Sequence, residues 1–197
     1  GGYTTWPART AGLVEQAEVA FGDAGSITAA QWNTGEITAG SIRRFVTKAN
    51  RKLPGADGDV KIDMTLTGSA DPKVKYTLGA AKVAGTVLDA VWEILSGDVG
   101  AITAGTISGS RIRAGIDPSV APEDLPDDAA DYQGQSTIRS VTLKGIKGQA
   151  KGTPTFADSI VTAWTLGSMK LKVVQTDNGD VDFGLAADTI KAVTGTT

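Results

Sequence analysis

Two stretches of the sequence carry the residue types that bind hard metal ions. Residues 117–131 (DPSVAPEDLPDDAAD) hold six carboxylates and no basic residue, and residues 177–182 (DNGDVD) place Asp and Asn at short intervals. Carboxylate and amide oxygens are the ligands that Ca²⁺ prefers. The candidate calcium ligands are Asp124, Asp127 and Asp128 in the first stretch, and Asp177, Asn178, Asp180 and Asp182 in the second.

Each stretch also has a simpler interpretation. The first contains three prolines and lacks the D-x-D-x-D-G spacing with a distal Glu, so it fits a solvated loop. The second contains Asn-Gly, which forms a tight turn without a metal. Calcium is therefore the one cofactor that the sequence leaves open.

A basic patch lies near the loop KLPG at residues 52–55. It consists of Arg43, Arg44, Lys48, Arg51 and Lys52. Such a patch could bind an acidic polysaccharide or the acidic loop of a neighbouring subunit, or it could be the solvated face of a strand followed by a polar loop.

Several kinds of chemistry are excluded by composition. The chain has no His and no Cys, which removes Cys/His zinc sites, disulfides, thiol nucleophiles and Ser-His-Asp triads. The net charge is −3, so no global basic field attracts nucleic acid or an anionic membrane. No stretch approaches the roughly 20 apolar residues of a membrane span. We expect no nucleic-acid partner and no membrane span.

Repeated phrases indicate which elements carry these residues. GSITAAQW (25–32) and GTVLDAVW (85–92) share one pattern, and each is followed by a related phrase, GEITAGSI (35–42) or GAITAGTI (100–107). Residues 158–171 form a weaker copy around Trp164. We expect Trp32 and Trp92 to occupy equivalent places in successive layers of one stacked scaffold.

A second repeat places a basic residue after an apolar one. It reads [ST]-apolar-basic and begins at Ser41, Thr137, Ser168 and Thr189. In a strand, this alternation puts the apolar residues on one face and Arg or Lys on the other.

The repeats favour an all-β fold. Twelve short β-rich segments end at Gly, Asp or Asn, and their irregular spacing with insertions is typical of a parallel β-helix, or β-solenoid. A β-sandwich is the alternative. These segments are 26–30, 36–40, 41–48, 59–68, 74–81, 90–95, 101–107, 110–116, 136–146, 159–164, 169–176 and 188–193.

The predicted organisation is an N-terminal segment, 1–24, before a repetitive β domain, 25–197, with loop insertions near 49–58 and 117–135. Residues 8–21 have a helical pattern, and we expect an amphipathic helix there that caps the first layer. Residues 83–95 also mimic a helix, but we predict strands because their first copy contains Thr, Asn and Gly.

Three longer phrases resemble segments of large repetitive proteins of planctomycetes and related bacteria. They are TAGTISGSRIRAGID (103–117), YQGQSTIRSVTLKGI (132–146) and residues 156–190, and the span that contains them is about half of the chain. The resemblance implies a β-helix-like fold and an exported or cell-surface location, and it transfers no catalytic residue. The initial Gly-Gly agrees with a processed piece of a longer protein.

These observations predict a non-enzymatic structural or adhesive domain of an exported bacterial surface protein. Its expected partners are other copies of itself or neighbouring repeats of a larger protein, with end-to-end assembly into filaments or a surface layer. The alternative is a domain that binds or cleaves polysaccharide, since β-helices also host polysaccharide lyases and glycosidases.

Overall fold

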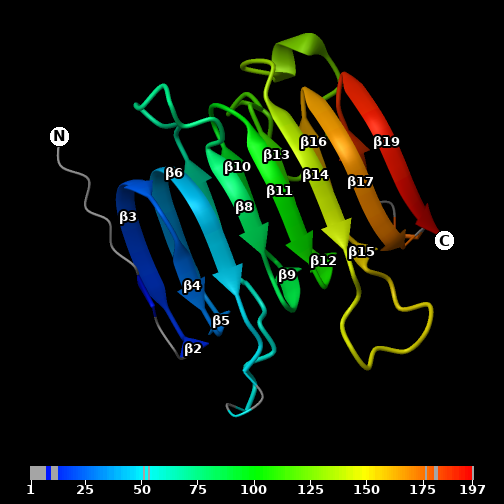
Figure 1. Ribbon diagram of the computed structural model, residues 1–197. Helices are drawn as coiled ribbons and strands as arrows, with labels where there is room; N and C mark the ends of the chain where they lie inside the picture. Colours follow the sequence, from blue (N-terminus) through cyan, green and yellow to red (C-terminus); the bar gives the residue numbers. More distant parts are fainter. Residues whose placement is uncertain are drawn as a thin grey trace.

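Figure 1 shows the computed structural model of the chain, which describes residues 8–9, 13–50, 52, 54–175, 177–179 and 182–196. Across these residues the protein is all-β, as predicted, with one short 3-10 helix, η1 (Ala129–Asp131). Each of the twelve segments predicted as strands overlaps an observed strand, and residues 83–95 form two strands rather than a helix.

One large parallel sheet dominates the described part of the chain and curls like half of a barrel. It bends at the long strand β6 (Gly35–Thr47), whose residues 36–39 pair with β7 and whose residues 42–46 pair with β8. The bend divides the sheet into two arms. The β18 arm contains β7 (Asp63–Leu66), β10 (Val91–Ile94), β13 (Arg111–Ala114), β16 (Ile160–Ala163) and β18 (Gly184–Ala186).

The second arm, which we call the β19 arm, faces the viewer in Figure 1. It contains β8 (Leu78–Lys82), β11 (Val99–Ala104), β14 (Thr137–Leu143), β17 (Thr165–Val173) and β19 (Thr189–Thr196). Strands β1 (Ala8–Arg9), β3 (Ala17–Ala24) and β4 (Ile27–Ala29) complete the sheet beyond β6.

Two small sheets form a third row of strands beside the arms. One pairs β2 (Leu13–Val14) with β5 (Gln31–Trp32), and the other contains β9 (Thr86–Leu88), β12 (Thr106–Ser108) and β15 (Phe156–Ala157). Single parallel bridges of Val60 to Trp32 and to Val87 join the two sheets into one row.

The chain visits these three rows in a fixed order. It runs from the β18 arm to the β19 arm and then to the third row, as in β10, β11, β12 and again in β13, β14, β15. All pairs between the described strands are parallel. A β-sandwich, which is built from antiparallel sheets, does not have this pairing.

Apolar side chains form the core as columns that run across the strands. In the β18 arm one column includes Ile37, Met64, Trp92, Ile112 and Val161, all of which are buried. The third row contributes a column with Trp32, Val60, Val87, Ile107 and Phe156. Full burial of one large apolar side chain stabilises the fold by about 1.5–3 kcal/mol, so these columns supply much of the stability.

The prediction that Trp32 and Trp92 are equivalent is wrong. Trp32 belongs to the third row, whereas Trp92 belongs to the β18 arm, and both rings contact Phe45 inside the molecule. Ile37 and Ile102, from the two ITAG phrases, also lie in different arms. Successive turns of the chain differ in length, so a phrase can recur without returning to the same column.

The basic repeat, in contrast, follows the columns at three of its four sites. Ile42, Ile138 and Ile190 share one column of the β19 arm, and the residues three places later, Phe45, Val141 and Val193, share the next. The fourth site is shifted, because Leu166 rather than Met169 joins the first column. Two residues face outward between the two apolar ones, so the expected strict alternation does not hold there.

The helix predicted over residues 8–21 is wrong. The described residues of this range form β1, β2 and the start of β3, and β3 pairs in parallel with residues 35–42 of β6. Burial alternates along Ala17–Ala20, because successive side chains of a strand point to opposite faces. The strand forms because the edge of β6 is available to pair with it. The apolar spacing that resembled a helix therefore serves a strand.

Candidate functional site

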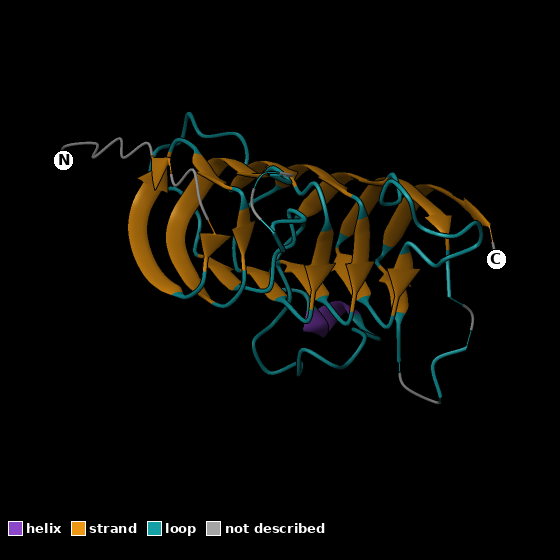
Figure 2. Cartoon of the chain, turned by 90° about the horizontal axis from the view of Figure 1, so that it is seen from below, coloured by secondary structure: helices purple, strands orange, loops and turns teal. Residues whose placement is uncertain are grey.

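The insertion between β13 and β14 covers part of the outer face of the β18 arm. Its two ends meet at an antiparallel bridge between Ile116 and Tyr132, and the amide of Asp117 donates to the carbonyl oxygen of Asp131 at 2.7 Å. Arg113 of β13 donates through Nη2 to the carbonyl oxygen of Val120 at 2.7 Å. Figure 2 shows this loop and η1 outside the strands.

A charged pair lies beneath this insertion. Nη1 of Arg113 is 3.4 Å from Oε1 of Glu93, with 2% of the Arg113 side chain and 22% of the Glu93 side chain exposed. Burial raises the pKa of Glu93, and the charge of Arg113 opposes that rise. The carboxylate is held by a guanidinium that also anchors the loop, so the pair is suited to fixing the insertion in place.

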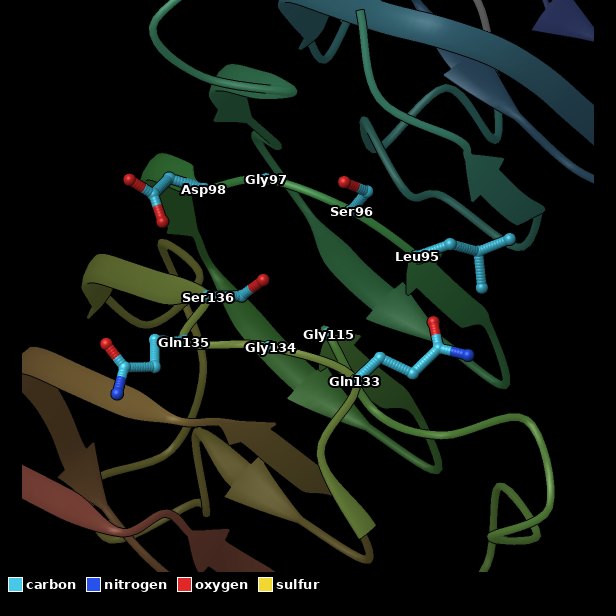
Figure 3. A pocket seen from close by; sticks show the side chains of 9 residues that line it. All are labelled: Leu95, Ser96, Gly97, Asp98, Gly115, Gln133, Gly134, Gln135 and Ser136. Carbon is cyan, nitrogen blue, oxygen red and sulfur yellow. The ribbon is translucent and has the colours of Figure 1, made fainter. Parts of the chain in front are cut away.

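A cavity of about 290 Å³ opens beside the insertion (Figure 3). The connection between β10 and β11 (95–98) runs along one side, and the returning end of the insertion (133–136) runs along the other. Its polar side chains are Ser96, Asp98, Gln133, Gln135 and Ser136.

The chemistry of this cavity is hydrogen bonding. Oδ1 of Asp98 accepts from the amide of Thr137 at 2.8 Å, so this carboxylate is already engaged with the backbone. No second carboxylate is among the lining residues. Amide and hydroxyl groups of this kind hold a small polar molecule such as a sugar, but they do not form the acid and base pair of a glycosidase.

A second cavity of about 200 Å³ lies on the other side of the insertion. Tyr132 and Trp164 meet there edge to face, with ring centroids 5.3 Å apart. Asp127, Asp128 and Asp188 also line it. Burial raises the pKa of Tyr132, and the nearby charges of Asp131 and Asp188 act in the same direction. Aromatic rings with carboxylates are groups that contact sugars or organic cations.

In the acidic insertion, hydrogen bonds within the loop engage one predicted calcium ligand, Asp128, and two carboxylates that were not predicted as ligands, Asp117 and Asp131. Asp128 caps η1 by accepting from the amide of Ala130 at 2.6 Å. The Asp131 carboxylate accepts from the amides of Asp127 and Asp128, and these bonds lower the pKa of Asp131. A hydroxyl donor from Ser119 lowers the pKa of Asp117 in the same loop.

The second calcium candidate contains a turn. Oδ1 of Asp177 accepts from the amide of Gly179 at 3.2 Å, and Asp180 lies outside the described residues. Among the residues that the structure describes, no three Asp, Glu, His or Cys side chains form a group that could hold a metal ion, so Asp124 and Asp182 join none.

The predicted basic patch is exposed where it is described. Arg43 and Arg44 project from the outer face of β6, and Lys48 and Lys52 lie in the loop that follows. Arg51 lies outside the described residues.

Sequence reasoning missed Glu93, Arg113 and Tyr132 as parts of a site. One signal was the alternation Arg111-Ile112-Arg113 directly before the long acidic insertion, which places a cation on the outer face where a loop can cover it. The partner Glu93 lies 20 residues earlier, and only the register of β10 with β13 brings the two together.

No protein-family model matches the chain, and neither a curated protein nor a solved structure is significantly similar to it. Within the described residues, no helix is both long enough and apolar enough to cross a membrane.

Proposed function

We propose that this chain is a non-enzymatic structural module, wound as a parallel β-helix, that assembles end to end at the surface of a bacterial cell. The fixed order of the two arms and the third row supports the winding, because a β-helix passes through its sheets in the same order in every coil. Inward columns shared by successive turns also support it.

The open end at β19 carries the assembly proposal. β19 is eight residues long and pairs with β17, and no described strand pairs with its other edge. Ile190 and Val193 continue two core columns, yet they are 42% and 50% exposed because none of the described residues covers them. Long edge strands with exposed apolar residues readily pair with another chain.

The usual protection of such an edge is sparse in β19. Its sequence, TIKAVTGT, contains one Lys and no Pro. A second copy of this chain is the occupant that we propose, because it would continue the parallel hydrogen bonds and cover Ile190 and Val193. Copies added in this way do not close into a ring, so they form a filament.

The location at the cell surface rests on the resemblance of residues 103–117, 132–146 and 156–190 to large repetitive proteins of planctomycetes and related bacteria. This location is tested by finding the protein in fractionated cells of its source.

The assembly is tested on the pure chain by light scattering coupled to size exclusion and by electron microscopy. The wild type should form elongated particles that lengthen with concentration, and Ile190→Lys with Val193→Lys should abolish them. Val74→Lys is the matched control, because Val74 is 37% exposed but lies outside the strands. A wild type that stays a 20.2 kDa monomer at all concentrations would overturn the proposal.

A polysaccharide-binding or polysaccharide-cleaving role is the second candidate, and the cavity with Tyr132 and Trp164 favours it. Aromatic rings beside carboxylates are suited to contact with neutral sugars. A glycan array tests binding, and release of reducing ends from polysaccharides tests cleavage as a lyase or glycosidase. Trp164→Ala should abolish either signal.

A further inference from the structure

The outer face of the β19 arm has one sign of charge. The strand segments that form this face, including residues 41–47 of β6, contain no Asp or Glu. Its basic residues are Arg43, Arg44, Lys82, Arg139, Lys170, Lys172 and Lys191. This concentration is unexpected in a chain whose net charge is −3.

These side chains are open to solvent. All seven are exposed, and within the described part of the chain none forms an ion pair with a carboxylate, whereas Arg113 in the β18 arm does. The neighbouring Tyr76 responds to this charge, because a hydrogen bond from Arg139 and the proximity of Lys75 lower its pKa. Cations that lack counter-charges create a positive potential over the whole face.

The register arranges the outward groups in straight columns. One column runs from Lys82 through Thr103 and Thr142 to Lys170 and on to Thr194. Adjacent strands are about 4.8 Å apart, so the ammonium groups and hydroxyls recur at regular steps along the molecule. A parallel column contains Ala80, Ala101, Ser140, Ser168 and Ala192. These side chains are small, so they project less from the sheet than the neighbouring Lys and Arg side chains.

We infer that this face binds a linear acidic polysaccharide, with the sugar chain lying across the strands. Lys and Arg would pair with its carboxylates or sulfates, and the Thr and Ser hydroxyls would bond to its hydroxyl groups. Single-stranded nucleic acid binds through aromatic platforms, and the strand segments on this face place none outward. A membrane surface usually receives an apolar wedge, which these small polar residues do not offer.

The test measures binding of polygalacturonate to the pure chain by calorimetry at low and moderate salt. Lys82→Thr with Lys170→Thr copies the threonines already present in that column, so the variant should keep the fold, which circular dichroism and melting verify. We expect its affinity to fall on the order of tenfold or more, with a shallower salt dependence.

The control removes the same charge elsewhere. Lys147→Thr with Lys151→Thr lies in the exposed loop after β14, and its affinity should stay within about twofold of the wild type. Equal loss in both variants, or no binding by the wild type, would overturn the inference. So would tighter binding of an oligothymidylate or of phosphatidylserine vesicles than of polygalacturonate. Calorimetry reports the affinity and the number of bound polysaccharide molecules per protein chain. The result of this test is therefore independent of whether the chain forms filaments.

Discussion

At the scale of single residues, close contact between successive strands of the β19 arm depends on glycine. Gly79, Gly100 and Gly167 follow the first inward residue of their strands, Leu78, Val99 and Leu166. A Cβ on Gly100 would lie 2.1 Å from the carbonyl oxygen of Gly79, and the other two would lie 2.4 and 2.1 Å from carbonyl oxygens of Arg43 and Arg139. These contacts involve backbone, which cannot move aside without breaking the ladder.

Gly100→Ala should therefore destabilise the fold by about 1–3 kcal/mol, measured as the free energy of unfolding in urea. Gly134→Ala is the control, because a Cβ there has no atom within 4 Å and the backbone needs no positive φ. It should be neutral or stabilise by about 0.4–1 kcal/mol. Equal effects of the two substitutions would show that the strands are not in close contact at Gly100.

The buried pair beneath the insertion makes stability depend on pH. Burial raises the pKa of Glu93, so above pH about 4.3, the ordinary value for Glu, the folded chain keeps a proton that the unfolded chain has lost. The contribution of Glu93 to the free energy of unfolding therefore falls as the pH rises through this window, until Glu93 ionises in the folded state.

Glu93→Gln removes this dependence. The free energy of unfolding of the variant minus that of the wild type should increase with pH above about 4.3, as measured by urea titrations at several pH values. In a chain that keeps Glu93, Arg113→Gln should make the free energy of unfolding fall more steeply with pH than in the wild type, because the cation that favours ionisation of Glu93 is lost. Parallel pH profiles for wild type and Glu93→Gln would contradict the assignment.

At the scale of elements, local sequence predicts strands better than it predicts their columns. The Ile-Arg-Arg-Phe phrase of β6 and the Ile-Arg-Ser-Val phrase of β14 share columns because each phrase lies within a single strand, where the backbone fixes the spacing of its residues. The Trp phrases do not, because insertions change the length of each turn between them. Trp92 follows Met64 by 28 residues in its column, whereas Ile112 follows Trp92 by 20.

The candidate site was less predictable than the strands. The acidic loop is evident in the sequence. The hydrogen bonds of its carboxylates to the amides of η1 and of the loop itself are not, because they depend on the local backbone geometry. The pairing of Glu93 with Arg113 depends on register, which composition does not encode. The glycines of the β19 arm did carry a signal, since Leu-Gly-Ala-Ala, Val-Gly-Ala-Ile and Leu-Gly-Ser-Met repeat one pattern.

The insertion after β13 and the loop after β14 should differ in what their removal costs. Deleting residues 119–130 removes the Val120 carbonyl that holds Arg113 and uncovers the charged pair, so thermal unfolding should occur at a lower temperature. Deleting 147–152 removes exposed residues only, so the melting temperature should change little. Equal shifts in calorimetric scans of the two variants would show that the first insertion is not anchored by Arg113.

At the scale of the whole molecule, the β-helical winding that we propose implies that stability is a sum of contacts between neighbouring coils. β18 and β19 pair with β16 and β17 and with no earlier strand, so the last turn contributes to the fold through one interface. Removing residues 175–197 exposes Leu166 and Met169 in place of Ile190 and Val193, so the β19 arm again ends in a strand with two apolar side chains.

The shortened chain should therefore fold, retain its β circular dichroism signal and unfold cooperatively, at a lower temperature than the full chain. A single half-barrel sheet that folds as one unit makes the opposite prediction, because loss of the strands at both ends of its path would disrupt the whole cooperative sheet. Circular dichroism melts of the two chains at equal concentration distinguish these outcomes. A shortened chain without β structure would contradict the coil-by-coil organisation from which the end-to-end assembly is argued.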